Sequence, residues 1–162
     1  MFKQLVVAAS VAISAPALAE ACPEPAGWAV PERHAAARVP SFRFALKPET
    51  AHQLQLLPSG QVKLATGNAR KPAVGGYAGL AAIDVAQAGT LDVLLSGKAY
   101  VDLVRDGKTV VASAHRHLGC GGIFKRVSFE VVPGRYIVQL TNSAARSVRL
   151  ATIAHPTGTK RK

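Results

Sequence analysis

Acidic side chains are scarce in this chain: nine Asp and Glu stand against 20 Lys and Arg among 162 residues, which gives a formal net charge of +11. No long apolar run follows the N-terminus, and its absence excludes a polytopic membrane protein. The chain is nevertheless 49% apolar and only 18% charged, which excludes a disordered protein. Its length suits one domain and is short for two.

Motifs for catalysis are also missing. Ser113 lies two residues before His115, but it lies in no nucleophile-elbow motif and has no evident orienting acid. The run Gly119–Gly122 matches neither standard spacing of a phosphate-binding loop. Carboxylates that could pair for acid–base chemistry are instead scattered singly, at Asp92, Asp102, Asp106 and Glu130. The sequence therefore favours a non-catalytic protein and leaves enzyme activity open.

The N-terminus carries the features of an export signal. Lys3 supplies a positive charge, Leu5–Ala15 is apolar, and Ala17-Leu18-Ala19 has the small-x-small pattern of a cleavage site before Glu20. These features predict a signal peptide over residues 1–19, cleaved between Ala19 and Glu20, and a periplasmic or secreted protein without a transmembrane span in the mature chain. The alternatives are a buried N-terminal helix and a lipoprotein anchored at Cys22, although Glu20 stands where a lipoprotein signal requires a small residue.

Only two cysteines are present, Cys22 and Cys120. In an oxidising compartment, two cysteines in a small domain usually pair. We therefore predict a Cys22–Cys120 disulfide that ties the extended segment 20–40 to the domain and contributes up to roughly 4–5 kcal/mol. The alternative is a free thiol at Cys120 that serves as a metal ligand, and the sequence leaves open whether the two cysteines pair within one chain.

Alternating apolar and polar residues predict an all-β protein. Asp106-Gly107 lies between two β-rich runs and predicts a two-residue hairpin. Turn signals every 8–12 residues predict one antiparallel β-sandwich or jelly-roll-like domain over residues 41–154, followed by a basic tail over 155–162, while residues 29–38 allow some helix. The predicted strands cover 41–46, 51–57, 61–66, 77–86, 91–96, 99–105, 109–117, 124–132, 135–141 and 148–154.

His115 and His117 form the candidate metal site. Residues two apart on a strand share one face, which places the two imidazoles about 6.5–7 Å apart along the strand. They could bind zinc, copper or iron, with Cys120 as a third ligand if it is reduced. In the hairpin register Lys98 lies opposite His115, and its positive charge disfavours a cation. Three alternatives to metal binding therefore remain. The two histidines could simply lie on a solvated edge face, they could form a pH-sensitive contact, or the protein could hold no cofactor at all.

The basic charge suggests the kind of partner. Aromatic residues amount to only 6% of the chain, and most fall at predicted core positions, so nucleic-acid binding is not expected. Anionic components of the cell envelope, or a secreted protein, are the expected partners.

Two resemblances extend this interpretation. The turn-to-strand pattern of residues 88–95 repeats at 133–140, and residues 88–154 resemble the pre-peptidase C-terminal domains of bacteria, which implies a secreted, non-catalytic β-sandwich. The chain as a whole resembles small exported proteobacterial proteins of unknown function, some of them labelled homogentisate 1,2-dioxygenase. The residues that carry this second resemblance are Cys22, Trp28, Ala99–Val104, His115-Arg116-His117, Cys120 and Val132–Tyr136.

The sequence thus predicts an exported, disulfide-tethered, non-catalytic module that binds a ligand or the cell envelope. The alternative, which the second resemblance implies, is a metal-binding protein or metal-dependent oxidoreductase that uses His115 and His117.

Overall fold

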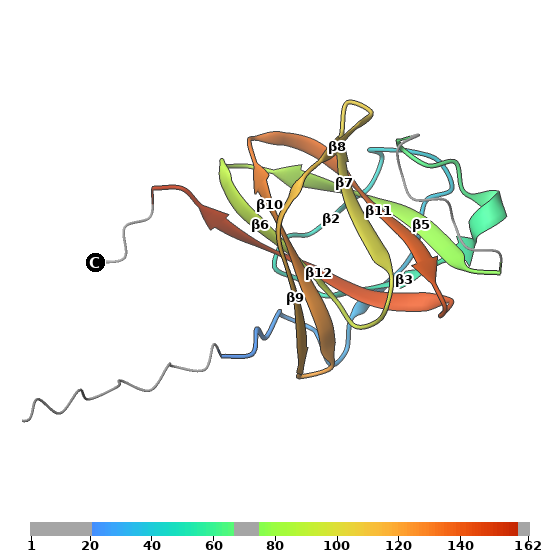
Figure 1. Cartoon of the computed structure of the whole chain (residues 1–162), viewed down its shortest axis with the longest axis horizontal. Helices are drawn as coiled ribbons and strands as arrows, with labels where there is room; N and C mark the ends of the chain where they lie inside the picture. Colours follow the sequence, from blue (N-terminus) through green and yellow to red (C-terminus); the bar gives the residue numbers. More distant parts are fainter. Residues whose placement is uncertain (1–20, 67–74, 159–162) are drawn as a thin grey trace, which may run out of the picture.

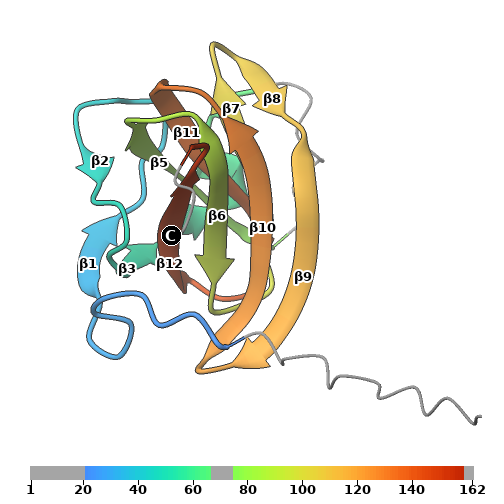
Figure 2. The same cartoon turned by 90° about the vertical axis from the view of Figure 1, so that its left-hand side faces the viewer.

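Two β-sheets packed face to face make up the fold (Figure 1, Figure 2). The computed structural model describes residues 21–66 and 75–158. The predicted signal peptide, with Ala19 and Glu20, lies outside them. The predicted all-β sandwich is confirmed. Within the described ranges, no helix is long and apolar enough to cross a membrane.

The first sheet has six strands in the spatial order β1-β3-β12-β6-β10-β9. Their bounds are β1 Glu32–Ala35, β3 His52–Gln55, β12 Ser147–Pro156, β6 Gly89–Leu95, β10 Ile123–Val131 and β9 Ala112–Cys120. The second sheet has the order β2-β5-β11-β7-β8, with β4 paired to β5. Its strands are β2 Ala45–Leu46, β4 Leu57–Pro58, β5 Tyr77–Val85, β7 Tyr100–Arg105, β8 Lys108–Val110 and β11 Gly134–Ser143. All pairings are antiparallel except β1 with β3 and β2 with β5.

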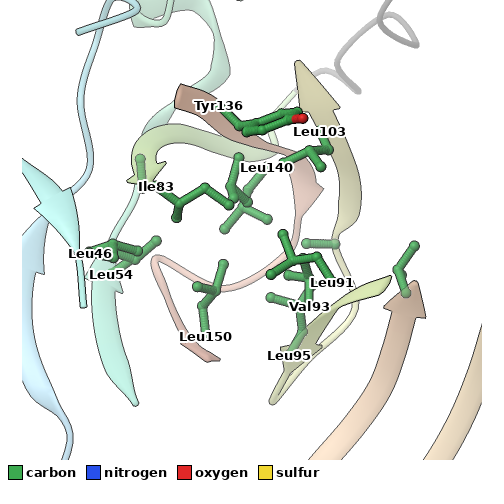
Figure 3. Close-up of a cluster of buried hydrophobic side chains, with 14 of the residues drawn as sticks. Leu46, Leu54, Ile83, Leu91, Val93, Leu95, Leu103, Tyr136, Leu140 and Leu150 are labelled. Carbon is green, nitrogen blue, oxygen red and sulfur yellow. The ribbon is translucent and has the colours of Figure 1, made fainter. Parts of the chain in front are cut away.

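The main core lies between the two sheets (Figure 3). Leu91, Val93 and Leu95 of β6 point into it because alternate residues of a strand share a face. Leu94 points outward instead, and it is still buried because the N-terminal segment packs Trp28 over that outer face. The outer face of the sheet is therefore covered where the N-terminal segment crosses it.

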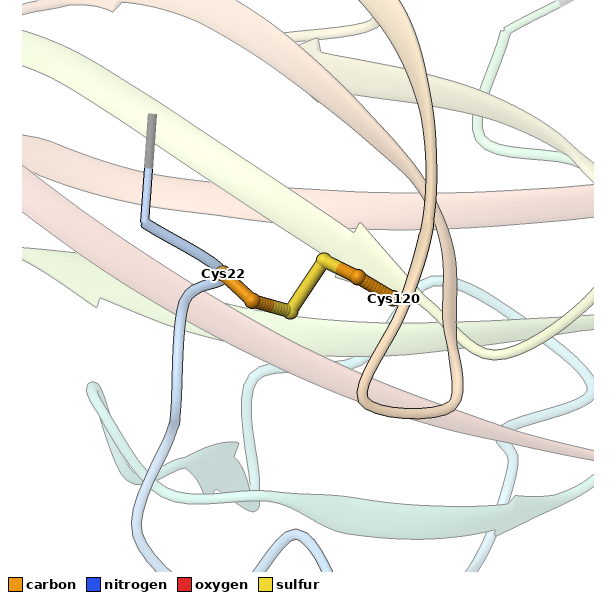
Figure 4. Close-up of a disulfide and its surroundings, with 2 residues drawn as sticks. All are labelled: Cys22 and Cys120. Atoms are coloured by element: carbon orange, nitrogen blue, oxygen red, sulfur yellow. A yellow bond between two sulfur atoms is a disulfide. The ribbon is translucent and has the colours of Figure 1, made fainter. Parts of the chain in front are cut away.

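A disulfide between Cys22 and Cys120 holds that N-terminal segment (Figure 4). It joins the segment to the end of β9, beside the turn into β10, with the two Cα atoms 6.0 Å apart. The predicted tether is therefore present within one chain. The helix that the sequence allowed over residues 29–38 is wrong, because Glu32–Ala35 pairs as β1 with β3.

Three predicted strands of the N-terminal half are corrected. The predicted strand 51–57 divides into β3 of the first sheet and β4 of the second. Over 41–46 only Ala45–Leu46 forms a strand, and Phe42 and Phe44 are exposed rather than buried, since Arg135 stacks on the Phe42 ring and His34 on the Phe44 ring. Residues 61–66 form no strand. Ser59–Gln61 is a 3-10 helix, and the backbone N–H of Ala65 donates to the Gln139 side chain instead of to a neighbouring strand.

The hairpin at Asp106-Gly107 follows the predicted register only as far as Val110, which pairs with Leu103. Both turn residues have positive φ, 49° and 72°, as a type I′ turn requires. The predicted single strand 109–117 is wrong: the chain leaves the second sheet at Val111 and continues as β9 in the first. Lys98 therefore does not pair with His115, whose register partner is Val127.

The last strand is longer than predicted. β12 continues to Pro156, two residues beyond Ala154, because His155 pairs with Thr90 and its ring lies 3.0 Å from the Asp92 carboxylate. The predicted basic tail over 155–162 thus begins in a strand, and its last four residues lie outside the described ranges.

Candidate metal centre

Three possible metal ligands meet where β1 pairs with β3. Glu32 and His34 lie two residues apart on β1, so their side chains share a face. His52 begins β3 and is the register partner of Glu32. The ligand atoms of the three side chains all lie within 4.8 Å of one another. In the described part of the chain, no other group of three or more His, Cys, Asp or Glu side chains is so placed.

Both imidazoles face the same carboxylate oxygen. Glu32 Oε2 lies 3.5 Å from His34 Nε2 and 3.9 Å from His52 Nδ1. Both nitrogen atoms are buried, and neither has a hydrogen-bond partner among the residues that the structure describes. Tetrahedral zinc with nitrogen and oxygen ligands places the ligand atoms about 3.3–3.4 Å apart. Glu32 is close to this spacing from both rings, whereas the two imidazole nitrogens, up to 4.8 Å apart, would have to approach each other to bind one ion in this geometry.

A backbone carbonyl on the other side of the ring decides which nitrogen of a neutral His52 carries the proton. This ring is 1% exposed, and its Nε2 lies 3.0 Å from the carbonyl oxygen of Lys47. A carbonyl only accepts, so Nε2 carries the proton, and in the neutral ring Nδ1 presents its lone pair. That lone pair faces another acceptor, Glu32 Oε2. A backbone carbonyl on the far ring nitrogen is also the usual arrangement around a metal-bound histidine.

Lys47 keeps Glu32 ionised. Its Nζ lies 3.4 Å from Glu32 Oε1, and this hydrogen bond together with the lysine charge holds the pKa of Glu32 below its ordinary value. Because Lys47 takes Oε1, the other oxygen of the carboxylate stays directed at the two imidazoles. The cluster thus offers one anionic oxygen and two imidazole nitrogens, a donor set suited to zinc, copper or iron.

Sequence reasoning missed this cluster. The spacing of Glu32 and His34 was the available signal, since an extended segment places both on one face. The third member, His52, is 18 residues further along the chain and joins them only through the parallel pairing of β1 with β3. The local sequence pattern does not predict that pairing.

The predicted pair, His115 and His117, lies on the exposed edge strand β9. The two rings are close, with centroids 5.0 Å apart. Cys120, the third ligand considered for this pair, is bound in the disulfide, so the alternative of a free thiol ligand is wrong. Both histidines line a pocket of about 300 Å³ that also contains Lys98 and Lys125. These lysines oppose a bound cation, and metal binding by this pair stays a prediction.

The environment of His115 makes a pH-dependent prediction. Partial burial, and then the charges of Lys125 and His117, lower the pKa of His115 below 6.5. The unfolded chain therefore binds more protons than the folded one just below pH 6.5, and this histidine reduces stability as the pH falls through that window. We expect an NMR titration of the folded protein to place the His115 midpoint below 6.5, and His117→Gln to raise it part of the way. A midpoint at or above 6.5 would contradict this account; the urea-unfolded chain supplies the reference.

Comparison with known proteins returned no match among family models, curated proteins or solved structures.

Proposed function

We propose that this protein is an exported, non-catalytic binding module whose ligand is one divalent transition-metal ion, held by Glu32, His34 and His52. One observation carries the proposal: two buried imidazole nitrogens without hydrogen-bond partners face the same carboxylate oxygen. A buried polar atom without a hydrogen-bond partner costs free energy, and a cation bound between these three atoms would engage all of them at once. The disulfide supports export, because such bonds persist in oxidising compartments.

Zinc is the ion that this donor set fits best. Two imidazoles and one carboxylate leave a fourth tetrahedral position for water. Two histidines and a carboxylate also hold iron in oxygenases that lack haem. If the alternative function, a metal-dependent oxidoreductase, applies, we propose that it uses this cluster and not His115 and His117.

The test is metal binding by the oxidised protein, purified without a histidine tag. We expect calorimetry to show one zinc ion per chain. Outer-shell changes alone cost about 10–100-fold in metal affinity, so loss of a direct ligand in Glu32→Gln or His34→Ala should weaken binding at least about 100-fold. These two positions are chosen because they are more exposed than His52, which protects the fold.

The matched control removes the other histidine pair. His115→Ala combined with His117→Ala should leave zinc affinity unchanged. If the control abolishes binding while Glu32→Gln does not, the ion belongs to the β9 pair and the proposal fails. One equivalent of iron in the protein as purified would instead favour the oxidoreductase.

A further inference from the structure

A polar hollow of about 720 Å³ opens on the outer face of the first sheet, where β1, β3 and β12 lie side by side. His52 and Leu54 of β3 point into the molecule, so Gln53 and Gln55 point out of it. The lining residues are Ala29, Val30, Pro31, Arg33, His34, Ala35, Gln53, Gln55, Ser147 and Arg149. We name this hollow the Arg33–Arg149 groove.

The strand register arranges the polar side chains of the groove in two rows. Arg33, Gln53 and Arg149 are consecutive partners across the three strands. Ala35, Gln55 and Ser147 form the next row in the same way. Neighbouring strands are about 4.8 Å apart, so the two arginines leave the sheet about 10 Å apart with an amide between them. No carboxylate is among the described residues that line the groove.

The two arginines differ in how they are held. Arg149 donates from Nη1 to the carbonyl oxygen of Trp28 at 2.9 Å and lies over the Trp28 ring, which fixes its position. Arg33 is exposed. Among the described residues no hydrogen bond or ion pair engages the side chains of Arg33, Gln53 or Gln55, so their polar groups are available to a ligand.

We infer that the Arg33–Arg149 groove binds an anionic saccharide, with acid groups of the sugar on the two arginines and its hydroxyls on the side chains between them. Guanidinium groups bind carboxylate and phosphate in bidentate fashion. Amides and hydroxyls, here Gln53, Gln55 and Ser147, both donate and accept, as sugar hydroxyls do.

Composition and lining favour a saccharide over other polyanions. Apart from His34, the described residues that line the groove include no aromatic ring on which a nucleotide base could stack. Its apolar side chains are small and give little surface for an acyl chain. The excess of basic residues, which gives +11 over the whole chain, would attract an anionic polymer over longer distances.

The experiment compares a charged and a neutral sugar of equal length. Trigalacturonate and its neutral counterpart galactotriose are titrated into the oxidised full-length protein by calorimetry at 0.15 M salt. We expect trigalacturonate alone to bind. Arg33→Gln should weaken it about tenfold, the effect of losing a hydrogen bond to a charged group. Gln53→Ala should weaken it less.

Lys108→Gln is the matched control, because it removes one exposed charge from β8 of the other sheet. It should change the affinity less than twofold. Equal losses in Lys108→Gln and Arg33→Gln would reveal diffuse electrostatic attraction and overturn the inference, and so would equal binding of galactotriose. Binding of inorganic phosphate with no dependence on Gln53 would reassign the groove to a small anion.

The saccharide proposal and the metal proposal can be tested independently of each other. Only His34 belongs to both, and neither Arg33 nor Gln53 is a proposed metal ligand. The titration is therefore repeated with a chelator and with Glu32→Gln. Unchanged saccharide affinity in both is the expected result, and it would hold even if the protein bound no metal. A loss of saccharide binding in both would contradict a groove that acts by itself.

Discussion

Replacing both cysteines, Cys22→Ser with Cys120→Ser, is expected to lower the free energy of unfolding by about 2–5 kcal/mol. The two residues are 98 positions apart, so the bond closes a loop that spans most of the domain. In the chain-entropy model a loop of this length contributes roughly 4–5 kcal/mol, chiefly by restricting the unfolded chain. The folded state should survive, because Trp28 packs with Leu94 and Ile123 independently of the bond.

Urea unfolding at pH 7, followed by circular dichroism, measures this effect. The double variant should show a lower midpoint and, because its unfolded chain is less restricted, a slope at least as steep as that of the oxidised protein. Reducing agent should bring the wild-type protein to the same midpoint and leave the double variant unaffected. A difference below about 1 kcal/mol would mean that the packing of Trp28, rather than the disulfide, secures the N-terminal segment.

Two strands of the C-terminal half, β6 and β10, were predictable because their patterns are unambiguous. Val127, Phe129 and Val131 alternate with polar residues and all three are buried. Residues 91–95 are mostly apolar on both faces, and the structure explains this by covering both faces of β6. Local pattern and tertiary environment agree there, so the sequence alone places the strand.

Prediction failed where a distant segment decides the local structure. The alternation around Phe42 and Phe44 has a strand period, yet Arg135 and His34 supply partners for the two rings at the surface. The register from Asp106-Gly107 is right for three pairs, but no local signal marks Val111 as the point where the chain changes sheets. The sequence did not predict the Glu32 cluster for the same reason, because His52 joins it only through the long-range pairing of β1 with β3.

Tyr136 gives the second large effect: Tyr136→Ala is expected to cost about 3–5 kcal/mol of stability, as for other large aromatic truncations in cores. Its ring is 2% exposed and belongs to the main core. Its hydroxyl donates to the Val132 carbonyl at 2.8 Å and accepts from the Val132 N–H at 3.1 Å. Arg105 Nη1 also donates to this oxygen, at 3.2 Å. Tyrosines that bond back to a backbone a few residues upstream recur at the corners of β-sandwiches.

Tyr136→Phe separates the hydroxyl from the ring. It keeps the core packing and removes the bonds that pin the crossing from β10 to β11, so we expect a loss of about 1–3 kcal/mol. Tyr77→Phe is the matched control: within the described part of the chain its hydroxyl accepts a single, exposed bond, from Arg146, and its loss should stay within about 0.5 kcal/mol. Thermal and urea unfolding of the three variants measure the difference. Equal small losses in both phenylalanine variants would show that the Tyr136 ring stabilises this corner by packing alone.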